Sequence, residues 1–251
     1  MKPNISEFSY GYALTEDIIR WAGTPLTAAP LFPSLIQEGQ SGGGFDLNLN
    51  FKSGSPLFLQ FKMSNYMKSQ RANEFRYFNQ PYYRFHLRSL KYSKQHELLI
   101  ELENKGNFVC YAAPIFHEVS ELNQAYIAHR VAQQSIFFQP SEIGHLPDSK
   151  EHSIVFDNHR NAYFCSEPTP IKALGGNELA EYIKSQTLSK IPDIESYTIS
   201  NMLGRLSSQM IEIIRGTFSN IEISTRLETE QKVAYLARTF FGCELFLARN
   251  K

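Results

Sequence analysis

Apolar and polar residues alternate along two neighbouring stretches of the chain, at residues 45–51 and 57–63, on either side of the turn sequence KSGSP. Successive side chains of a β-strand point to opposite faces, so this alternation predicts two half-buried strands. Gly54 is the natural turn residue between them. A hairpin centred there places Phe51 opposite Leu57 and gathers the whole apolar set on one face, which specifies the register.

The same register gathers polar side chains on the other face of the predicted hairpin. It puts Asp46 opposite Lys62, with Gln60 as their neighbour. Directly opposed and diagonal residues of an antiparallel pair lie within contact distance of one another. Two interpretations remain open at this point: a small functional cluster, or a solvated face with an Asp–Lys cross-strand pair.

Helical and strand periods divide the rest of the chain into two parts. Thr15, followed by two acids, predicts the start of a helix that runs through Trp21. Residues 95–106 fit a helix but also fit a strand over 98–102. The remaining patterns predict a helix over 80–91, a strand over 108–116, a helix over 119–134, a hairpin turning at 157–160, and helices over 175–186, 196–218 and 229–242. The sequence therefore predicts an α/β fold, a mixed sheet flanked by helices, over residues 1–172, and a helical C-terminal region over 173–251.

Composition narrows the class of protein. An apolar fraction of 42%, with 19 Phe and 13 Tyr among 251 residues, supplies a sizeable core and excludes a disordered chain. The three cysteines form no CxxC pair, so neither a zinc site nor a disulfide framework is indicated. Cysteines without a predicted disulfide are typical of a reducing compartment, and the sequence has no signal-peptide pattern and no apolar run of membrane-spanning length. We therefore expect a cytoplasmic protein without a membrane partner.

A basic segment follows the second predicted strand. The formal net charge of the chain is zero, yet Lys62–Lys94 holds eight Lys and Arg residues against one acid, Glu74, with aromatic residues interleaved. Such a local excess of cations is typical of a surface that binds phosphates. The predicted nucleic-acid contacts are Lys68, Arg71, Arg76, Arg84 and Arg88. An aromatic core helix with a solvated basic side would have the same composition.

The residues GGGFD, at 42–46, and LQFK, at 59–62, resemble the core motif of the PD-(D/E)xK nuclease superfamily. The resemblance is to its Mrr-type, restriction endonuclease-like members, which carry Gln-x-Lys in place of Glu-x-Lys. It covers about residues 8–115 in element order, and its specific part is Gly43–Lys62.

The resemblance implies a set of site residues. Asp46 would be the main ligand of Mg²⁺ or Mn²⁺, with the Gln60 amide oxygen and the Phe61 carbonyl as further ligands. Lys62 would hold the nucleophilic water or the developing charge on phosphate. The first helix of such folds contributes a Glu, for which Glu16 is the first choice. Asp17, Glu7 and Glu38 are the alternatives.

We therefore expect a metal-dependent endonuclease that acts on DNA in preference to RNA, as an effector of a prokaryotic antiviral defence system. The C-terminal region would serve a homo-oligomer or a partner subunit. The alternative is a catalytically inactive protein of the same core that binds nucleic acid or a partner subunit. A purely structural interaction protein, with the hairpin as scaffold, is a third class.

Overall fold

The computed structural model describes residues 1–22, 56–165, 168–188, 196–218, 221, 223 and 227–247 of the chain. The fold is mixed α/β, with two sheets, flanking helices and a helical C-terminal region. The chain divides into two compact units. Unit 1 comprises residues 1–21, 61–96 and 110–182, and unit 2 comprises 22–60, 97–109 and 183–251. The division is discontinuous, unlike the single boundary after residue 172 that the sequence predicted, because segments distant in the chain pack together in each unit.

The first sheet of unit 1 is antiparallel throughout, in the order β2-β3-β6-β7-β8. The predicted hairpin at 157–160 is confirmed: β6 and β7 pair with Ser153 opposite Cys165. The Asp157 carboxylate closes its turn by accepting hydrogen bonds from the backbone N–H groups of His159 and Asn161, at 2.9 and 3.0 Å. The strands of this sheet are β2 (Asn65–Met67), β3 (Tyr82–Leu87), β6 (His152–Phe156), β7 (Ala162–Cys165) and β8 (Thr169–Pro170).

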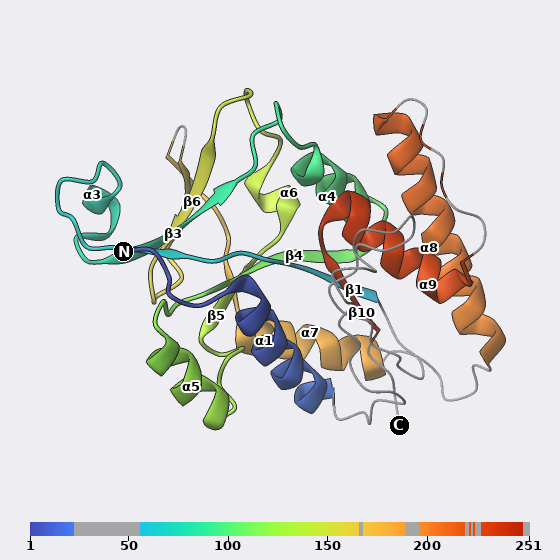
Figure 1. The fold of residues 1–251 in the computed structure, drawn as a ribbon, viewed down its shortest axis with the longest axis horizontal. Coiled ribbons are helices and arrows are strands. Elements are labelled where there is room, and N and C mark those ends of the chain that lie inside the picture. Colours follow the sequence, from blue (N-terminus) through green and yellow to red (C-terminus); the bar gives the residue numbers. More distant parts are fainter. Residues whose placement is uncertain are drawn as a thin grey trace. The chain divides into compact units, whose positions relative to one another are not determined.

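The predicted helix over residues 80–91 is wrong, since β3 occupies its centre. Figure 1 shows β3 beside β6, and β3 is hydrogen-bonded to β2 on one edge and to β6 on the other. Tyr83 and Phe85 face the core, where Phe85 packs against Phe138. Aromatic residues fit the pleated surface of a sheet. Pairing with a neighbouring strand on each edge of β3 outweighs the helix propensity of this stretch of sequence. The short helix α3 (Phe75–Phe78) covers the other face through Phe78, which stacks on Tyr82.

The second sheet has the order β10-β1-β4-β5-β9. In it, β4 (Phe108–Pro114), which enters unit 1 at Cys110, pairs with β5 (Ser135–Phe138), and β5 pairs with β9 (Leu174–Gly175). The predicted strand over 108–116 is confirmed, and every residue of β4 is buried. A strand buried on both faces reads as a continuous apolar run, as Phe108–Pro114 does. The short helix α6 (Pro140–Ile143) follows β5, and α7 (Gly176–Leu188) follows β9.

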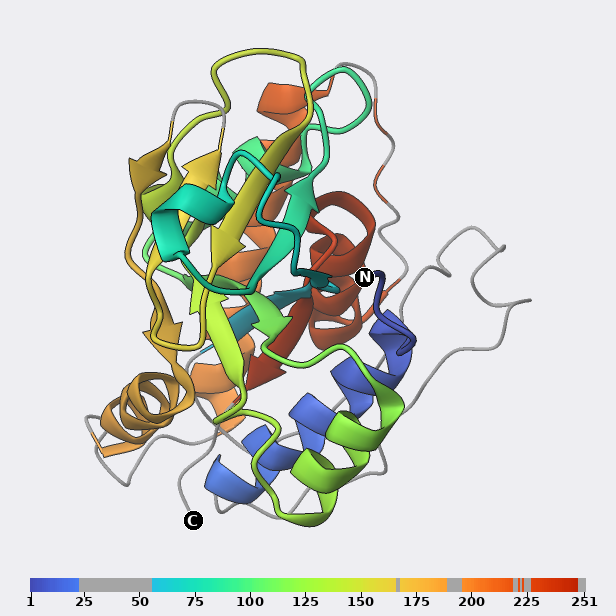
Figure 2. The same cartoon turned by 90° about the vertical axis from the view of Figure 1, so that its left-hand side faces the viewer.

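Helix α1 (Glu7–Ala22) begins well before the predicted start at Thr15. The backbone N–H of Ser9 donates to the Ser6 hydroxyl at 3.0 Å, so Ser6 caps the helix, whereas the Thr15 hydroxyl donates to the Gly11 carbonyl within it. Figure 2 shows α1 alongside α5 (Val119–Ile127), and the Tyr12 and Tyr126 rings lie 6.4 Å apart. Helix α5 is shorter than the predicted 119–134, because His129 has a left-handed φ of 51°.

Unit 2 contains a strand pair and most of the helical C-terminal region. Strand β1 (Pro56–Phe61), of which Phe61 already belongs to unit 1, pairs antiparallel with β10 (Glu244–Leu247), so that Leu57 lies opposite Phe246. Residues 95–106, whose pattern fitted both a helix and a strand, form helix α4 (Gln95–Asn104). The predicted C-terminal helices are confirmed as α7, α8 (Ser196–Thr217), α9 (Thr229–Leu236) and the π-helical turn Ala237–Phe241.

The helices of unit 2 pack through apolar stripes of helical period. On α8 the stripe is buried and faces α9, where Val233 and Leu236 are also buried. The α8 stripe consists of Leu203, Leu206, Met210, Ile213 and Ile214. Within the described residues, no helix combines the length and the apolarity that a membrane span requires.

Candidate nucleic-acid site around Lys62

Lys62 follows the last residue of β1, and unit 1 fixes its position. Its backbone N–H donates to the Ala112 carbonyl at 2.9 Å, and its Nζ lies 5.7 Å from the centroid of the Tyr111 ring. Tyr111 is fully buried and shares a 2.8 Å hydrogen bond with His96 Nδ1. His96 Nε2 lies 2.8 Å from the Gly144 carbonyl, and because a carbonyl oxygen only accepts, Nε2 is the donor in that hydrogen bond. Lys62 therefore extends over a rigid aromatic surface.

The electrostatic environment of Lys62 is set by burial and by two charged residues. Burial lowers the pKa of Lys62 to about 8, the nearby Arg88 lowers it further, and the Glu7 carboxylate opposes both. Glu7 is the first residue of α1. Of the acids considered on the first helix, Glu7 is therefore the one whose charge acts on Lys62.

The first-choice acid, Glu16, has other partners. Its carboxylate forms an ion pair with Arg20 at 2.7 Å. A hydrogen bond from Tyr126 on α5, together with Arg20, lowers the pKa of Glu16. Asp17 is buried, and it accepts the backbone N–H of Ala132 at 3.0 Å. Glu38 lies outside the described residues.

Gln60 is a second unusual polar residue on the same stretch of chain. It lies two residues before Lys62, so along an extended backbone both side chains leave the chain on the same side. Gln60 is only 7% exposed, and its Oε1 has no hydrogen-bond partner among the described residues. The interpretation as a solvated face is therefore wrong for Gln60. A buried amide oxygen without a donor is destabilising, and a cation would satisfy it.

The rest of the predicted hairpin lies outside the described residues. This applies to Asp46, to the glycines before it and to the strand over 45–51. Among the described residues, Pro56–Leu59 pairs with β10, from the opposite end of the chain, and β4 lies on the other edge of β1. Among the residues that the structure describes, no group of three or more His, Cys, Asp or Glu side chains is arranged to hold a metal ion. Asp46 is not among the residues searched.

The cations of the basic segment differ in their surroundings. Lys68, Arg71, Arg76 and Arg88 are exposed. Arg84 instead forms a 3.3 Å ion pair with Glu74, and both side chains are mostly buried, at 27% and 19% exposure. The Tyr82 hydroxyl donates to the same carboxylate at 3.1 Å. The acid of the segment is thus neutralised inside the fold, and the exposed side chains keep a positive charge.

The aromatic residues of the segment, Tyr92 excepted, are buried or half-buried, so they pack against the fold as the alternative interpretation proposed. Tyr82, Tyr83 and Phe85 are buried, and Tyr77 packs against Tyr163 with ring centroids 5.1 Å apart. The exception is Tyr92, whose side chain is 77% exposed.

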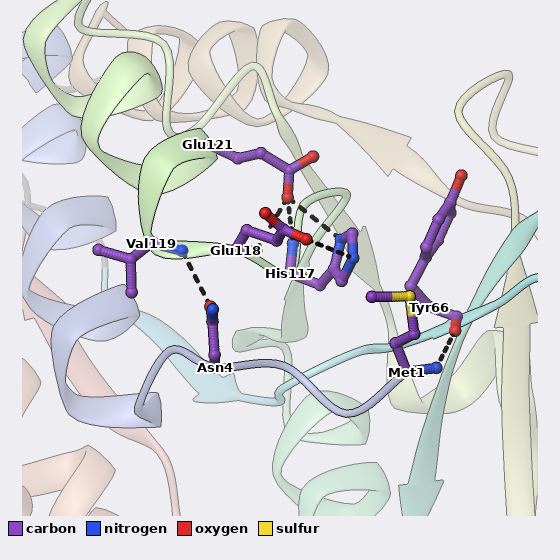
Figure 3. Close-up of polar contacts among 7 residues, drawn as sticks. All are labelled: Met1, Asn4, Tyr66, His117, Glu118, Val119 and Glu121. Carbon is purple, nitrogen blue, oxygen red and sulfur yellow. Dashed lines mark hydrogen bonds and ion pairs between the residues drawn. The ribbon is translucent and has the colours of Figure 1, made fainter.

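A buried histidine outside the predicted site lies beside strand β2. Figure 3 shows the His117 ring directed toward Glu118 and Glu121, with Tyr66 of β2 beside it. His117 Nδ1 lies 3.1 Å from the Glu121 carboxylate, and its ring centroid lies 4.5 Å from that of Tyr66. The N-terminal amine donates to the Tyr66 carbonyl, and Asn4 accepts the backbone N–H of Val119. The cluster is not apparent from local sequence, because its members come from three separate segments.

Comparison with protein-family models, with curated proteins and with solved structures returned no match to this chain. The site is therefore interpreted from its own geometry and from the motif in its sequence.

Proposed function

We propose that the protein is a metal-dependent endonuclease with a restriction endonuclease-like core, and that it cleaves phosphodiester bonds in nucleic acid, DNA in preference to RNA. The observation that carries this proposal is the buried Gln60 oxygen without a partner, two residues before a desolvated lysine. Both residues belong to the motif that resembles the PD-(D/E)xK nucleases.

The residue types fit an oxygen-ligated divalent cation. Asp46, Gln60 Oε1 and the Phe61 carbonyl would hold Mg²⁺ or Mn²⁺, which prefer oxygen ligands. The bound ion would polarise the scissile phosphate and lower the pKa of a water. With a pKa of about 8, Lys62 is cationic in most molecules near neutral pH, so its ammonium stabilises negative charge on the phosphate. Glu7 and the Tyr111 ring orient that ammonium.

The exposed cations of the basic segment would bind the phosphates that flank the cleaved bond. Lys68, Arg71, Arg76 and Arg88 belong to the same unit as Lys62, and phosphate contacts position a substrate without reading its sequence. We place the protein among effectors of prokaryotic antiviral defence, with the helical C-terminal region available to a second copy or a partner subunit.

A second candidate function follows from the neutral character of Gln60. A carboxylate at this position would bind a hard cation more strongly than an amide does. A protein of the same core that binds nucleic acid or a partner subunit without cleaving would retain the basic surface and lack turnover.

The test is incubation of the purified protein with labelled DNA and RNA, single-stranded and duplex, in Mg²⁺, Mn²⁺ or EDTA. We expect cleavage that requires the metal and is lost in Asp46→Ala and Lys62→Ala, while both variants stay folded, with a cooperative melting transition no lower than that of the wild type. Binding without cleavage under all these conditions would support the second candidate. Full cleavage by either variant would exclude this site.

A further inference from the structure

The connection between β3 and α4 is an ordered turn that displays one aromatic side chain. The backbone N–H groups of Tyr92 and Ser93 both donate to the Ser89 carbonyl, at 2.9 and 3.0 Å. Ser89 is buried, and its hydroxyl donates to the Ser149 carbonyl in a neighbouring loop. These bonds fix the backbone beneath Tyr92, so the ring needs little further ordering to bind a ligand.

Tyr92 is exposed where the other tyrosines of its segment are packed. Its side chain is 77% exposed, and the Nζ of its neighbour Lys91 lies 5.2 Å from the ring centroid. An exposed aromatic ring on a fixed turn contributes nothing to the core. It therefore offers a flat apolar surface to a partner.

The charges around the ring identify the chemistry of that partner. Arg88, Lys91 and Lys94 are exposed on the same turn, and the sequence over 88–96 contains no acid. In the neighbouring loop Asp148 is paired with Lys150 and with His152, at 3.7 and 3.2 Å, and Glu151 is exposed. An exposed aromatic ring with cations on the same turn matches a ligand with a phosphate backbone and flat bases.

We propose that Tyr92, with Arg88, Lys91 and Lys94, forms a stacking platform for an unpaired base, and that the preferred substrate is single-stranded nucleic acid. A duplex keeps its base faces inside the stack, whereas an unpaired base can lie on a tyrosine ring. This inference rests on the proposed function, for which it names the substrate class.

Arg88 connects the platform with the candidate site. It begins the turn that carries Tyr92, it is exposed, and it belongs to the same unit as Lys62. A strand whose base stacks on Tyr92 would thus pass its phosphates by Arg88 toward Lys62.

The experiment measures binding by fluorescence anisotropy in EDTA, with labelled oligothymidine, oligouridine and a mixed-sequence duplex. The proteins are the wild type, Tyr92→Ala, Tyr92→Phe and the control Ile127→Ala, which removes another side chain of 77% exposure. We expect Tyr92→Ala to weaken single-strand binding about 5- to 150-fold, the range of one base–aromatic stack. Tyr92→Phe and Ile127→Ala should stay within about twofold of the wild type, since a phenyl ring also stacks.

Two further readouts separate the outcomes. Tyr92→Ala should keep the wild-type salt slope, since a neutral ring releases no counterion. Equal single-strand affinity in wild type and Tyr92→Ala, or wild-type preference for the duplex, would overturn the platform and leave the nuclease proposal standing. Absence of binding and cleavage with every nucleic acid would overturn the nuclease proposal itself. Comparison of oligothymidine with oligouridine distinguishes DNA from RNA as the source of the strand.

Discussion

The ammonium of Lys62 lies 5.7 Å from the centroid of the Tyr111 ring, and Tyr111 is held in turn by its hydrogen bond to His96. The cation thus occupies a desolvated position above a rigid aromatic side chain. Burial disfavours the charged form of a lysine, while the ring and Glu7 favour it. This balance makes Lys62 sensitive to pH and to substitution.

Substitution of Lys62 should stabilise the fold in a pH-dependent manner. Its pKa is lowered from 10.5 to about 8 on folding, so between those values the unfolded chain binds more protons than the folded one. The free energy of unfolding therefore rises with pH across that window, and the destabilisation due to Lys62 is complete below pH 8. Lys62→Met should melt above the wild type at pH 7, and the difference should shrink toward pH 10. Lys150→Met, at an exposed position, is the control. A melting difference for Lys62→Met that does not change with pH would contradict the lowered pKa of Lys62.

Cleavage should depend on the ligands of the metal in a graded way. Asp46→Ala should abolish cleavage and leave nucleic-acid binding intact, while Gln60→Ala should cause a smaller loss. Gln60→Glu should keep activity or tighten Mg²⁺ binding, because a carboxylate is the stronger ligand for a hard cation. Isothermal titration of Mg²⁺ with cleavage rates at several metal concentrations measures both effects. An inactive Gln60→Glu variant that does not bind metal would argue against a ligand role.

Neutralisation of the exposed cations should weaken binding uniformly across sequences. Replacement of Lys68, Arg71 and Arg76 by Ala removes three phosphate contacts, and each should flatten the plot of log affinity against log salt by about 0.9 for duplex DNA, or about 0.7 for a single strand. The exposed Lys172, in another part of unit 1, serves as the control. Wild-type affinity and slope in the triple variant would restrict the contact surface to Arg88 and the turn that follows it.

The ion pair between Glu74 and Arg84 should contribute to stability, unlike the exposed cations around it. Glu74→Gln leaves the mostly buried Arg84 without its carboxylate, and it should lower the free energy of unfolding by about 1–3 kcal/mol. Glu212→Gln, which removes a more exposed pair with Lys105, should cost less than about 1 kcal/mol. Chemical denaturation of both variants measures the difference. Equal small losses would mean that Arg84 is available to nucleic acid after all.

Two glycines should respond to alanine in opposite directions. A Cβ at Gly11 would lie 2.7 Å from the Phe61 ring, which packs edge-on against Tyr10, so Gly11→Ala should destabilise by about 1–3 kcal/mol. A Cβ at Gly204 in α8 would meet nothing within 4 Å, so Gly204→Ala should stabilise by about 0.5–1 kcal/mol. Thermal unfolding measures both. Stabilisation by Gly11→Ala would show that α1 does not pack closely on Phe61.

The sequence alone determined the elements whose own period is unambiguous. The hairpin at 157–160, the strand from Phe108 and the C-terminal helices appear where apolar spacing of 2 or 3.6 residues, or a buried run, placed them. Side-chain period follows from backbone geometry, which is local, so a single stretch of sequence suffices to read it. The motif around Gln60 and Lys62 was visible for the same reason.

The tertiary structure decided which residues are partners. Residues 82–87 form a strand because β2 and β6 pair with both of its edges. Helix α1 begins at Glu7, well before the predicted start at Thr15, and the charge of Glu7 acts on Lys62. Arg84 was predicted to be an exposed cation, but it forms an ion pair with Glu74 inside the fold. In the sequence, Gln60 is one polar residue among many and Tyr92 is one aromatic residue among many. The structure buries Gln60 and exposes Tyr92. Burial and pairing depend on segments far away in the chain, and neither composition nor period contains that information.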